Sequence, residues 1–180
     1  MSTAYREVAA SDRRVGSMLL PRLGALVASS IVAALVFAML EMVLVAVVMG
    51  QPWYGPLHMI AAIVLGPNGL LPPPASFNIG IAGVAMVVHL VMAIVYGFVL
   101  SAILLALRRN FAWIAGLAFG IALYYINSYG FTALFPWFAE GRGWIGFVSH
   151  AVFGLVLALV YRKMDAREGS EPTVRDRPAP

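Results

Sequence analysis

Four long apolar runs constrain this chain more than any other feature of its sequence. A helix needs about 20 predominantly apolar residues to cross a bilayer. Four segments meet that requirement: 23–49, 79–107, 112–134 and 144–161. Hydrophobic residues make up 62% of the 180 residues and charged residues 11%, whereas about 25% of a soluble domain is charged. We therefore predict an all-α integral membrane protein, a bundle of four transmembrane helices.

The distribution of basic residues predicts the orientation. All but one of the 12 Lys and Arg residues lie before residue 23, in the turn at Arg108-Arg109, or after residue 161; the exception is Arg142. Cytoplasmic loops and tails carry the excess of Lys and Arg, so we expect both termini to be cytoplasmic. This placement also accounts for the net charge of +4 without a nucleic-acid partner.

Three segments lie outside the predicted helices. Residues 1–22 form an expected cytoplasmic N-tail, and residues 163–180 are polar enough to predict a disordered cytoplasmic tail. Residues 50–78 form a long outer loop, in which His58 to Leu65 is apolar but too short to span. That piece is predicted to be an interfacial or re-entrant helix at the outer end of the bundle. The chain has no cysteine, which excludes disulfides and thiolate sites.

The two halves of the chain resemble each other, which predicts two similar helical hairpins. In the second and fourth segments a histidine lies in a track of small residues with a spacing of four: Ala85, His89, Ala93, Gly97, Ser101, and Gly146, His150, Gly154, Ala158. The first and third segments share a weaker pattern: Ala34, Ala38, Glu41, and Gly120, Tyr124, Asn127. Small residues let helices approach closely in lipid, within one chain or in a homo-oligomer.

Glu41 is the only ionised side chain within the predicted helices, and a charge at that depth is costly. Counting from the helix ends places His89, His150 and Asn127 at a similar depth, in the outer half of the bilayer. We predict an intramembrane polar pocket centred on Glu41, His89 and His150. We expect Asn127 and Tyr124 to be orienting hydrogen-bond partners. His58 is expected to be a gate or an extra ligand.

Several roles are open to this cluster. One role is structural, in which the polar groups satisfy one another through hydrogen bonds from Glu41 to His89 or His150, at a gain of about 0.6 kcal/mol per contact. Paired histidines on two helices also suit a b-type haem, and His89, His150 and Glu41 together suit a divalent metal such as zinc, iron or copper.

Glu and His at membrane depth are relay groups of small proton-coupled transporters as well. No nucleophile–base pair, phosphate loop or carboxylate pair occurs, so we predict no enzyme.

Several stretches are similar to those of a known group of proteins: His58-Met59-Ile60-Ala61-Ala62-Ile63-Val64-Leu65-Gly66 with Leu71-Pro72-Pro73-Pro74, Val88-His89-Leu90, Asn127-Ser128-Tyr129-Gly130-Phe131-Thr132 and Phe135-Pro136-Trp137-Phe138. Between residues 22 and 161 the chain resembles small bacterial inner-membrane proteins of unknown function, some of them labelled sodium:proline symporters. Four helices are too few for the inverted repeats of that transporter class. The resemblance implies this topology and the bacterial inner (plasma) membrane.

Together these observations predict a non-enzymatic inner-membrane protein, either an accessory subunit of a larger membrane complex or a ligand-binding protein. Its polar pocket is expected to open toward the periplasm. The alternatives that stay open are a haem- or metal-binding protein and a small proton-coupled transporter.

An absorption spectrum with elemental analysis separates the cofactor alternatives. For a bis-histidine haem we expect a Soret band that is lost in His89→Ala and His150→Ala, because each variant removes an axial ligand. A bound metal ion in a protein without a Soret band would indicate a metal site. A colourless, metal-free protein, purified in mild detergent, would contradict both.

Overall fold

The structure is a computed structural model that describes residues 23–71, 76–107 and 111–168. The described part of the chain is helical and contains no strand. The predicted N-tail, the Arg108-Arg109 turn, the three consecutive prolines and most of the predicted C-tail lie outside the described residues.

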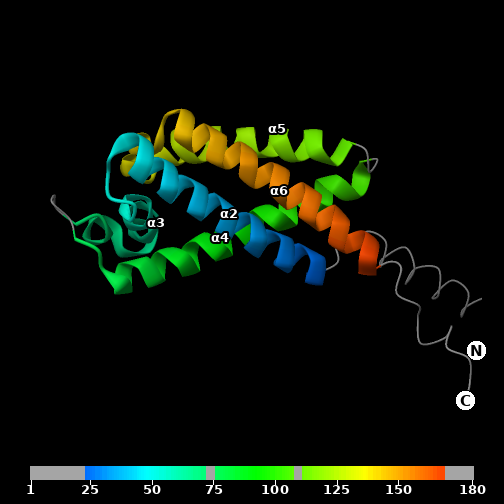
Figure 1. Cartoon of the computed structure of the whole chain (residues 1–180), viewed down its shortest axis with the longest axis horizontal. Coiled ribbons are helices and arrows are strands. Elements are labelled where there is room, and N and C mark those ends of the chain that lie inside the picture. Colours follow the sequence, from blue (N-terminus) through cyan, green and yellow to red (C-terminus); the bar gives the residue numbers. More distant parts are fainter. Residues whose placement is uncertain (1–22, 72–75, 108–110, 169–180) are drawn as a thin grey trace, which may run out of the picture.

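Four helices are long and apolar enough to cross a membrane, as predicted (Figure 1). They are α2 (Leu23–Met49), α4 (Ile79–Ala106), α5 (Ala112–Tyr125, continued by shorter helical turns to Ala133) and α6 (Trp144–Glu168). The amide of Ile81 donates to the side chain of Asn78, 3.1 Å away. This N-cap satisfies one of the free amides of the first turn and explains why α4 begins at Ile79.

Two helix ends differ from the predicted bounds. The fourth helix continues to Glu168 instead of ending at residue 161, because a helix made of good helix formers does not have to stop where the apolar run stops. The third changes at Ile126 into a π-helical turn, Ile126–Gly130, followed by a 3-10 turn, Phe131–Ala133. Polar residues and glycine of low helix propensity occupy this turn.

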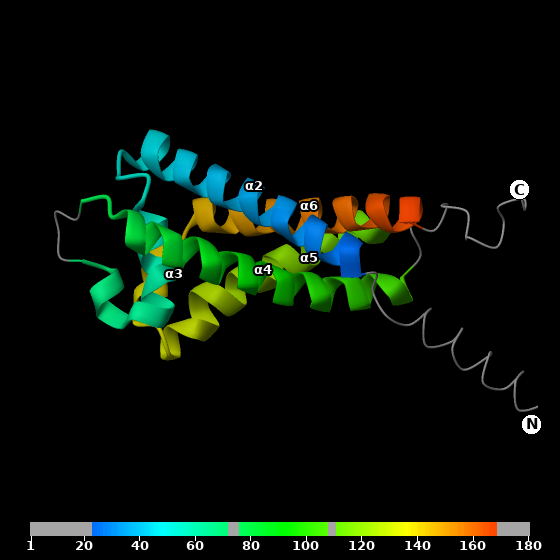
Figure 2. The same ribbon diagram turned by 90° about the horizontal axis from the view of Figure 1, so that it is seen from below.

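A short helix, α3 (Gly55–Leu65), lies within the predicted outer loop. It begins three residues earlier than the predicted apolar segment, because Pro56 is suited to a first helical turn. The helix packs against α4 and lies across the end of the bundle opposite to the end of α6 (Figures 1 and 2). Its eleven residues are too few to span a bilayer.

The helices run up and down in sequence, so that the start of α2 and the end of α6 lie at the same end of the bundle (Figure 2). The helix α6 packs along both α5 and α2, and α2 packs along α4. By contrast, α4 makes few contacts with α5 or α6. The bundle is therefore closed on the α2–α6–α5 side and open between α4 and the α5–α6 pair.

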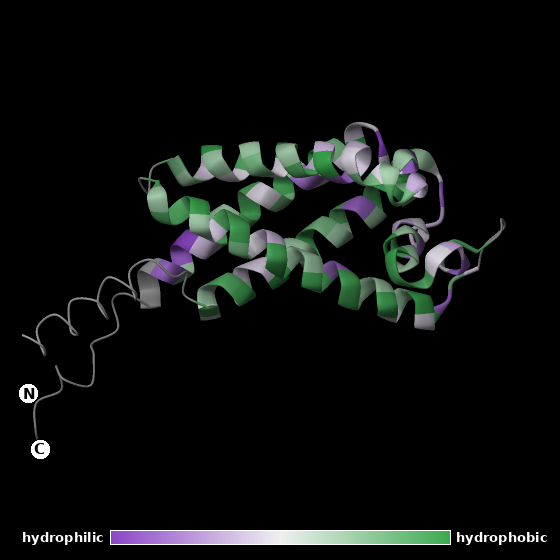
Figure 3. Ribbon diagram, turned by 180° about the vertical axis from the view of Figure 1, so that it is seen from behind, coloured by the Kyte–Doolittle hydropathy of each residue, from purple (hydrophilic) through white to green (hydrophobic). Residues whose placement is uncertain are grey.

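Glycines bring helix backbones together at the tightest of these interfaces. A Cβ atom on Gly154 would lie 2.1 Å from the carbonyl oxygen of Gly116, and one on Gly120 would lie 2.1 Å from that of His150. A Cβ on Gly97 would lie 2.0 Å from Ser30 Oγ of α2. The predicted small-residue tracks thus supply contacts between helices within the bundle. Large apolar side chains remain on the outer sides of the helices, while hydrophilic residues gather near α3 and along the last part of α6 (Figure 3).

We expect Gly154→Ala to destabilise the protein by about 1–3 kcal/mol, because its new methyl group would overlap the backbone of α5. The matched control is Gly83→Ala on α4, where a Cβ meets nothing within 4 Å. Thermal unfolding in mild detergent measures both. Equal melting temperatures for Gly154→Ala and the wild type would contradict the close packing of α5 on α6.

Candidate functional site

A cleft of about 940 Å³ lies between α4 on one side and α5 and α6 on the other, with α2 and α3 completing its walls. The indole Nε1 of Trp137 donates to the carbonyl oxygen of Met59, 3.0 Å away, and so ties the chain before α6 to α3. Polar residues from all these elements line the cleft: Glu41, His58, His89, Tyr96, Asn127, Ser128, Glu140, Arg142 and His150.

Five of the six residues predicted from the sequence line this one cleft: Glu41, His58, His89, Asn127 and His150. The sixth, Tyr124, is buried on α5 and supports the cleft from behind. Its ring lies edge-on to that of His150, with centroids 5.9 Å apart. Its hydroxyl accepts a hydrogen bond from the amide of Gly143, 3.0 Å away.

A chain of hydrogen bonds connects α4, α5 and α6 across the cleft. The Tyr96 hydroxyl donates to Asn127 Oδ1 at 2.9 Å, and Asn127 Nδ2 lies 3.1 Å from His150 Nε2. His150 Nδ1 lies 2.7 Å from the carbonyl oxygen of Gly146. Because a carbonyl oxygen only accepts, Nδ1 carries the proton, and Nε2 of a neutral His150 then accepts from Asn127. Both nitrogens of His150 are thus used within the protein.

His89 is held in a different way. Its Nε2 lies 3.0 Å from the carbonyl oxygen of Ala34 on α2, so Nε2 is the donor and the lone pair of a neutral imidazole is on Nδ1. The ring of Phe37 contacts both imidazoles, with centroids 5.4 Å from His89 and 4.9 Å from His150. Phe37 therefore supports the two histidine rings at once.

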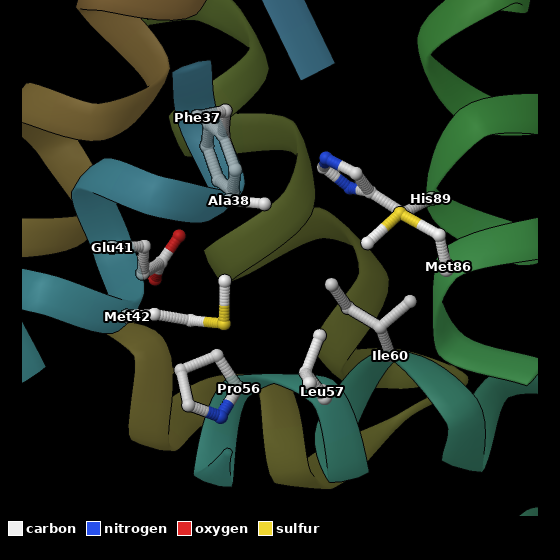
Figure 4. Close-up of a pocket in the computed structure, with 9 residues that line it drawn as sticks. All are labelled: Phe37, Ala38, Glu41, Met42, Pro56, Leu57, Ile60, Met86 and His89. Carbon is white, nitrogen blue, oxygen red and sulfur yellow. The ribbon is translucent and has the colours of Figure 1, made fainter. Parts of the chain in front are cut away.

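Glu41 and His89 line a small cavity of about 10 Å³ from opposite sides (Figure 4), and its volume is roughly the space of one water molecule. The rest of the cavity wall is apolar: Phe37, Ala38, Met42, Pro56, Leu57, Ile60 and Met86. Within the described residues Glu41 has no hydrogen bond or ion pair. The hydrogen bond expected from Glu41 to His89 or His150 is therefore not formed, because Ala34, Asn127 and Gly146 hold the imidazoles instead.

His58 approaches the cleft from α3. The side chain is 4% exposed, and its Nε2 is buried without a hydrogen-bond partner in the part of the chain that the structure describes. Its ring packs against that of Tyr54, with centroids 5.4 Å apart. A buried ring nitrogen without a partner is energetically unfavourable unless something else supplies one.

Sequence reasoning missed three residues of the site. Tyr96 follows His89 by seven positions, a spacing that places both on one helix face, and this signal was available. Phe37 gave no signal, because a phenylalanine in an apolar helix is ordinary. Arg142 was used only for orientation, yet its Nε donates to Ser128 O at 2.9 Å and its guanidinium lies 4.5 Å from the ring centre of Tyr129.

The histidines do not present a ready site for iron or another metal in this conformation. His150 uses both ring nitrogens and His89 uses Nε2 in hydrogen bonds to the protein. Across the described ranges, no three or more His, Cys, Asp or Glu residues are grouped so that they could hold a metal ion. A haem between the two imidazoles would also have to displace Phe37.

Comparison with protein-family models, with curated proteins and with solved structures gives no match. The cleft itself is therefore the basis on which a function can be proposed.

The hydrogen-bonded chain can be tested by a double-mutant cycle of Tyr96→Phe and Asn127→Leu. We expect a coupling energy of about 0.6–1.7 kcal/mol, the range of hydrogen bonds between membrane helices. Reversible unfolding in mixed micelles measures it. The control is Tyr125→Phe, which changes an exposed side chain on α5, two residues before Asn127. It should not couple to Asn127→Leu. Additive energies for Tyr96 and Asn127 would contradict their hydrogen bond.

Proposed function

We propose that this protein is a non-enzymatic ligand-binding protein of the bacterial inner membrane, whose cleft holds a small amphipathic molecule. The observation that carries the proposal is the cleft of about 940 Å³, which lies within the usual range of about 300–1,000 Å³ for small-molecule sites. Such sites have mostly apolar walls with a few polar groups that orient the ligand.

The lining of the cleft has this composition. Apolar and aromatic side chains come from several elements, among them Phe37, Val45, Leu123 and Phe153. Glu41 and the Nε2 atom of His58 lack partners among the described residues. A buried polar group without a partner costs about 1–3 kcal/mol, and a bound ligand that supplies hydrogen bonds would offset that cost.

The alternative roles have less support from this geometry. A purely structural cluster accounts for Tyr96, Asn127 and His150, but it leaves Glu41 unexplained. Haem or metal ligation by His89 and His150 requires free ring nitrogens, and three of their four are engaged in hydrogen bonds to the protein. Proton-coupled transport remains a prediction, supported by Glu41 and His89 lining the same small cavity.

The orientation belongs to the proposal as well. The excess of Lys and Arg in the two tails and in the middle turn supports cytoplasmic termini. The helix α3, which lines the cleft, lies at the end of the bundle opposite to the end of α6 (Figure 1), so the cleft would then face the periplasm. Homology between the two hairpins also remains a prediction. The tracks on α4 and α6 supply contacts inside the bundle, so they give little support to a homo-oligomer.

Filling the cleft tests the proposal. Met92 lines the cleft on α4, and its neighbour Val91 is 56% exposed on the outside of the same helix. We expect native mass spectrometry of the wild type, purified in mild detergent, to show a bound small molecule. Met92→Trp should lose it, because the indole occupies the space of the ligand, whereas Val91→Trp should keep it.

Two results would contradict this function. One is a wild-type protein that carries no bound molecule from its native membrane. The other is a bound molecule that is equally abundant in Met92→Trp, which would place it outside the cleft.

A further inference from the structure

The formal charges of the cleft are separated by depth. Of the described residues that line it, Glu41, Glu140 and Arg142 are formally charged. Glu140 and Arg142 are exposed in the segment before α6, whereas Glu41 is partly buried on α2. Glu41 precedes the end of its helix at Met49 by eight residues, or about 12 Å along the axis. The deep part of the cleft therefore carries a single formal charge, and it is negative.

The positive charge at the rim already has partners within the protein. Arg142 Nε donates to Ser128 O at 2.9 Å, and Nη2 donates to Thr132 Oγ1 at 3.4 Å. The guanidinium also lies over the ring of Tyr129. Glu41, by contrast, has no partner in the described ranges. The unmatched charge at depth is the Glu41 carboxylate, so its missing partner is a cation or a hydrogen-bond donor.

His89 is a second hydrogen-bond acceptor among the residues that line the cleft with Glu41. His89 gives its Nε2 proton to Ala34, which leaves the Nδ1 lone pair of the neutral ring as its remaining group. Glu41 and His89 line the same small cavity, and its other walls are apolar (Figure 4). Both residues also line the larger cleft, and a ligand there that meets two acceptors needs more than one donor. An ammonium group has up to three N–H donors and a positive charge.

Aromatic rings line the same cleft as this carboxylate. Five that line the cleft are Phe37, Tyr54, Tyr96, Trp144 and Phe153. The faces of aromatic rings attract cations, and sites for ammonium ligands use such rings. The cleft is much larger than an ammonium group, and its apolar lining suits a hydrocarbon body.

From these observations we infer that the cleft binds an amphiphilic amine, with its ammonium group between Glu41 and His89 and its hydrocarbon part along the aromatic walls. This inference rests on the ligand-binding function proposed above. An anionic amphiphile would face the Glu41 carboxylate, a neutral one would leave its charge unmatched, and a quaternary ammonium would offer no N–H donors. The ammonium group can belong to a free amine or to a lipid headgroup.

The test uses the full-length protein in phosphatidylcholine nanodiscs at neutral pH. Binding of dodecylamine, dodecyltrimethylammonium, dodecanol and dodecanoate is followed by tryptophan fluorescence, since Trp144 lines the cleft. We expect saturable binding of dodecylamine that is at least about 10-fold tighter than that of the other three probes. Glu41→Gln should weaken it by about 10- to 100-fold, the effect of losing a charged hydrogen bond.

Matched variants separate the role of Glu41 from general electrostatics and from folding. Glu140→Gln removes the same charge at the exposed rim and should leave dodecylamine binding unchanged. Glu41→Asp keeps the charge and should keep the preference for dodecylamine over dodecanol. If Glu41→Gln does not fold, this preference in Glu41→Asp and its loss in His89→Phe test the same site.

Lipid composition distinguishes the two sources of the amine. If phosphatidylethanolamine in the nanodisc weakens dodecylamine binding by competition, the natural ammonium group is that of a lipid headgroup. If it does not compete, the ligand is a free amphiphilic amine. Either result supports an ammonium site, provided that dodecylamine binding depends on Glu41.

Two outcomes would overturn the inference. One is equal binding of dodecylamine and dodecanol, and the other is dodecylamine binding that is unchanged in Glu41→Gln. In both cases a bound molecule that is lost in Met92→Trp would still support a ligand-binding function, with a ligand of different charge. Its retention in Met92→Trp would overturn the proposed function itself.

Discussion

The close packing of α6 against two neighbours is the constraint on which the rest of the structure depends. Gly116, Gly120 and Gly154 let α5 and α6 touch backbone to backbone, and another side of α6 packs along α2. Lipid tails are as apolar as the side chains, so moving those side chains from lipid into a helix interface gains little. Dispersion contacts of this kind hold the helices together instead. Because both faces of α6 are used in this way, α4 is attached through α2 and α3, and a cleft remains beside it.

The polar groups of the cleft divide into two kinds. Tyr96, Asn127 and His150 form a directed hydrogen-bonded chain across the open side, where α4 otherwise makes few contacts with α5 and α6. Their contribution is to hold the cleft at a defined width. Glu41 takes no part in this chain, and it lines an apolar cavity that His89 also lines. The lack of a hydrogen bond or ion pair to Glu41 within the described protein is the reason for proposing a ligand there.

Much of the fold, and part of the site, could be predicted from the sequence. The four apolar runs predicted the spans, and five of the six proposed site residues line one cleft. Helix ends were predicted less well. An apolar run indicates which residues lie inside the bilayer, whereas a helix ends where its backbone hydrogen bonding stops. The helix α6 continues past its apolar run, and α3 begins at the turn containing Pro56. The partners of each histidine could not be predicted, since spacing along the chain does not indicate the rotation of one helix against the next.

The sequence by itself determined that the chain forms four membrane-spanning helices with small-residue tracks and a carboxylate at depth. These properties depend only on contiguous residues and their spacing, because a helix satisfies its backbone hydrogen bonds internally in lipid. The tertiary structure decided which groups meet: His150 with Asn127, and His89 with the Ala34 carbonyl instead of with Glu41. Those pairings depend on how far apart the helices lie and how each is turned about its axis. Both are set by the contacts between the helices, above all at the glycines.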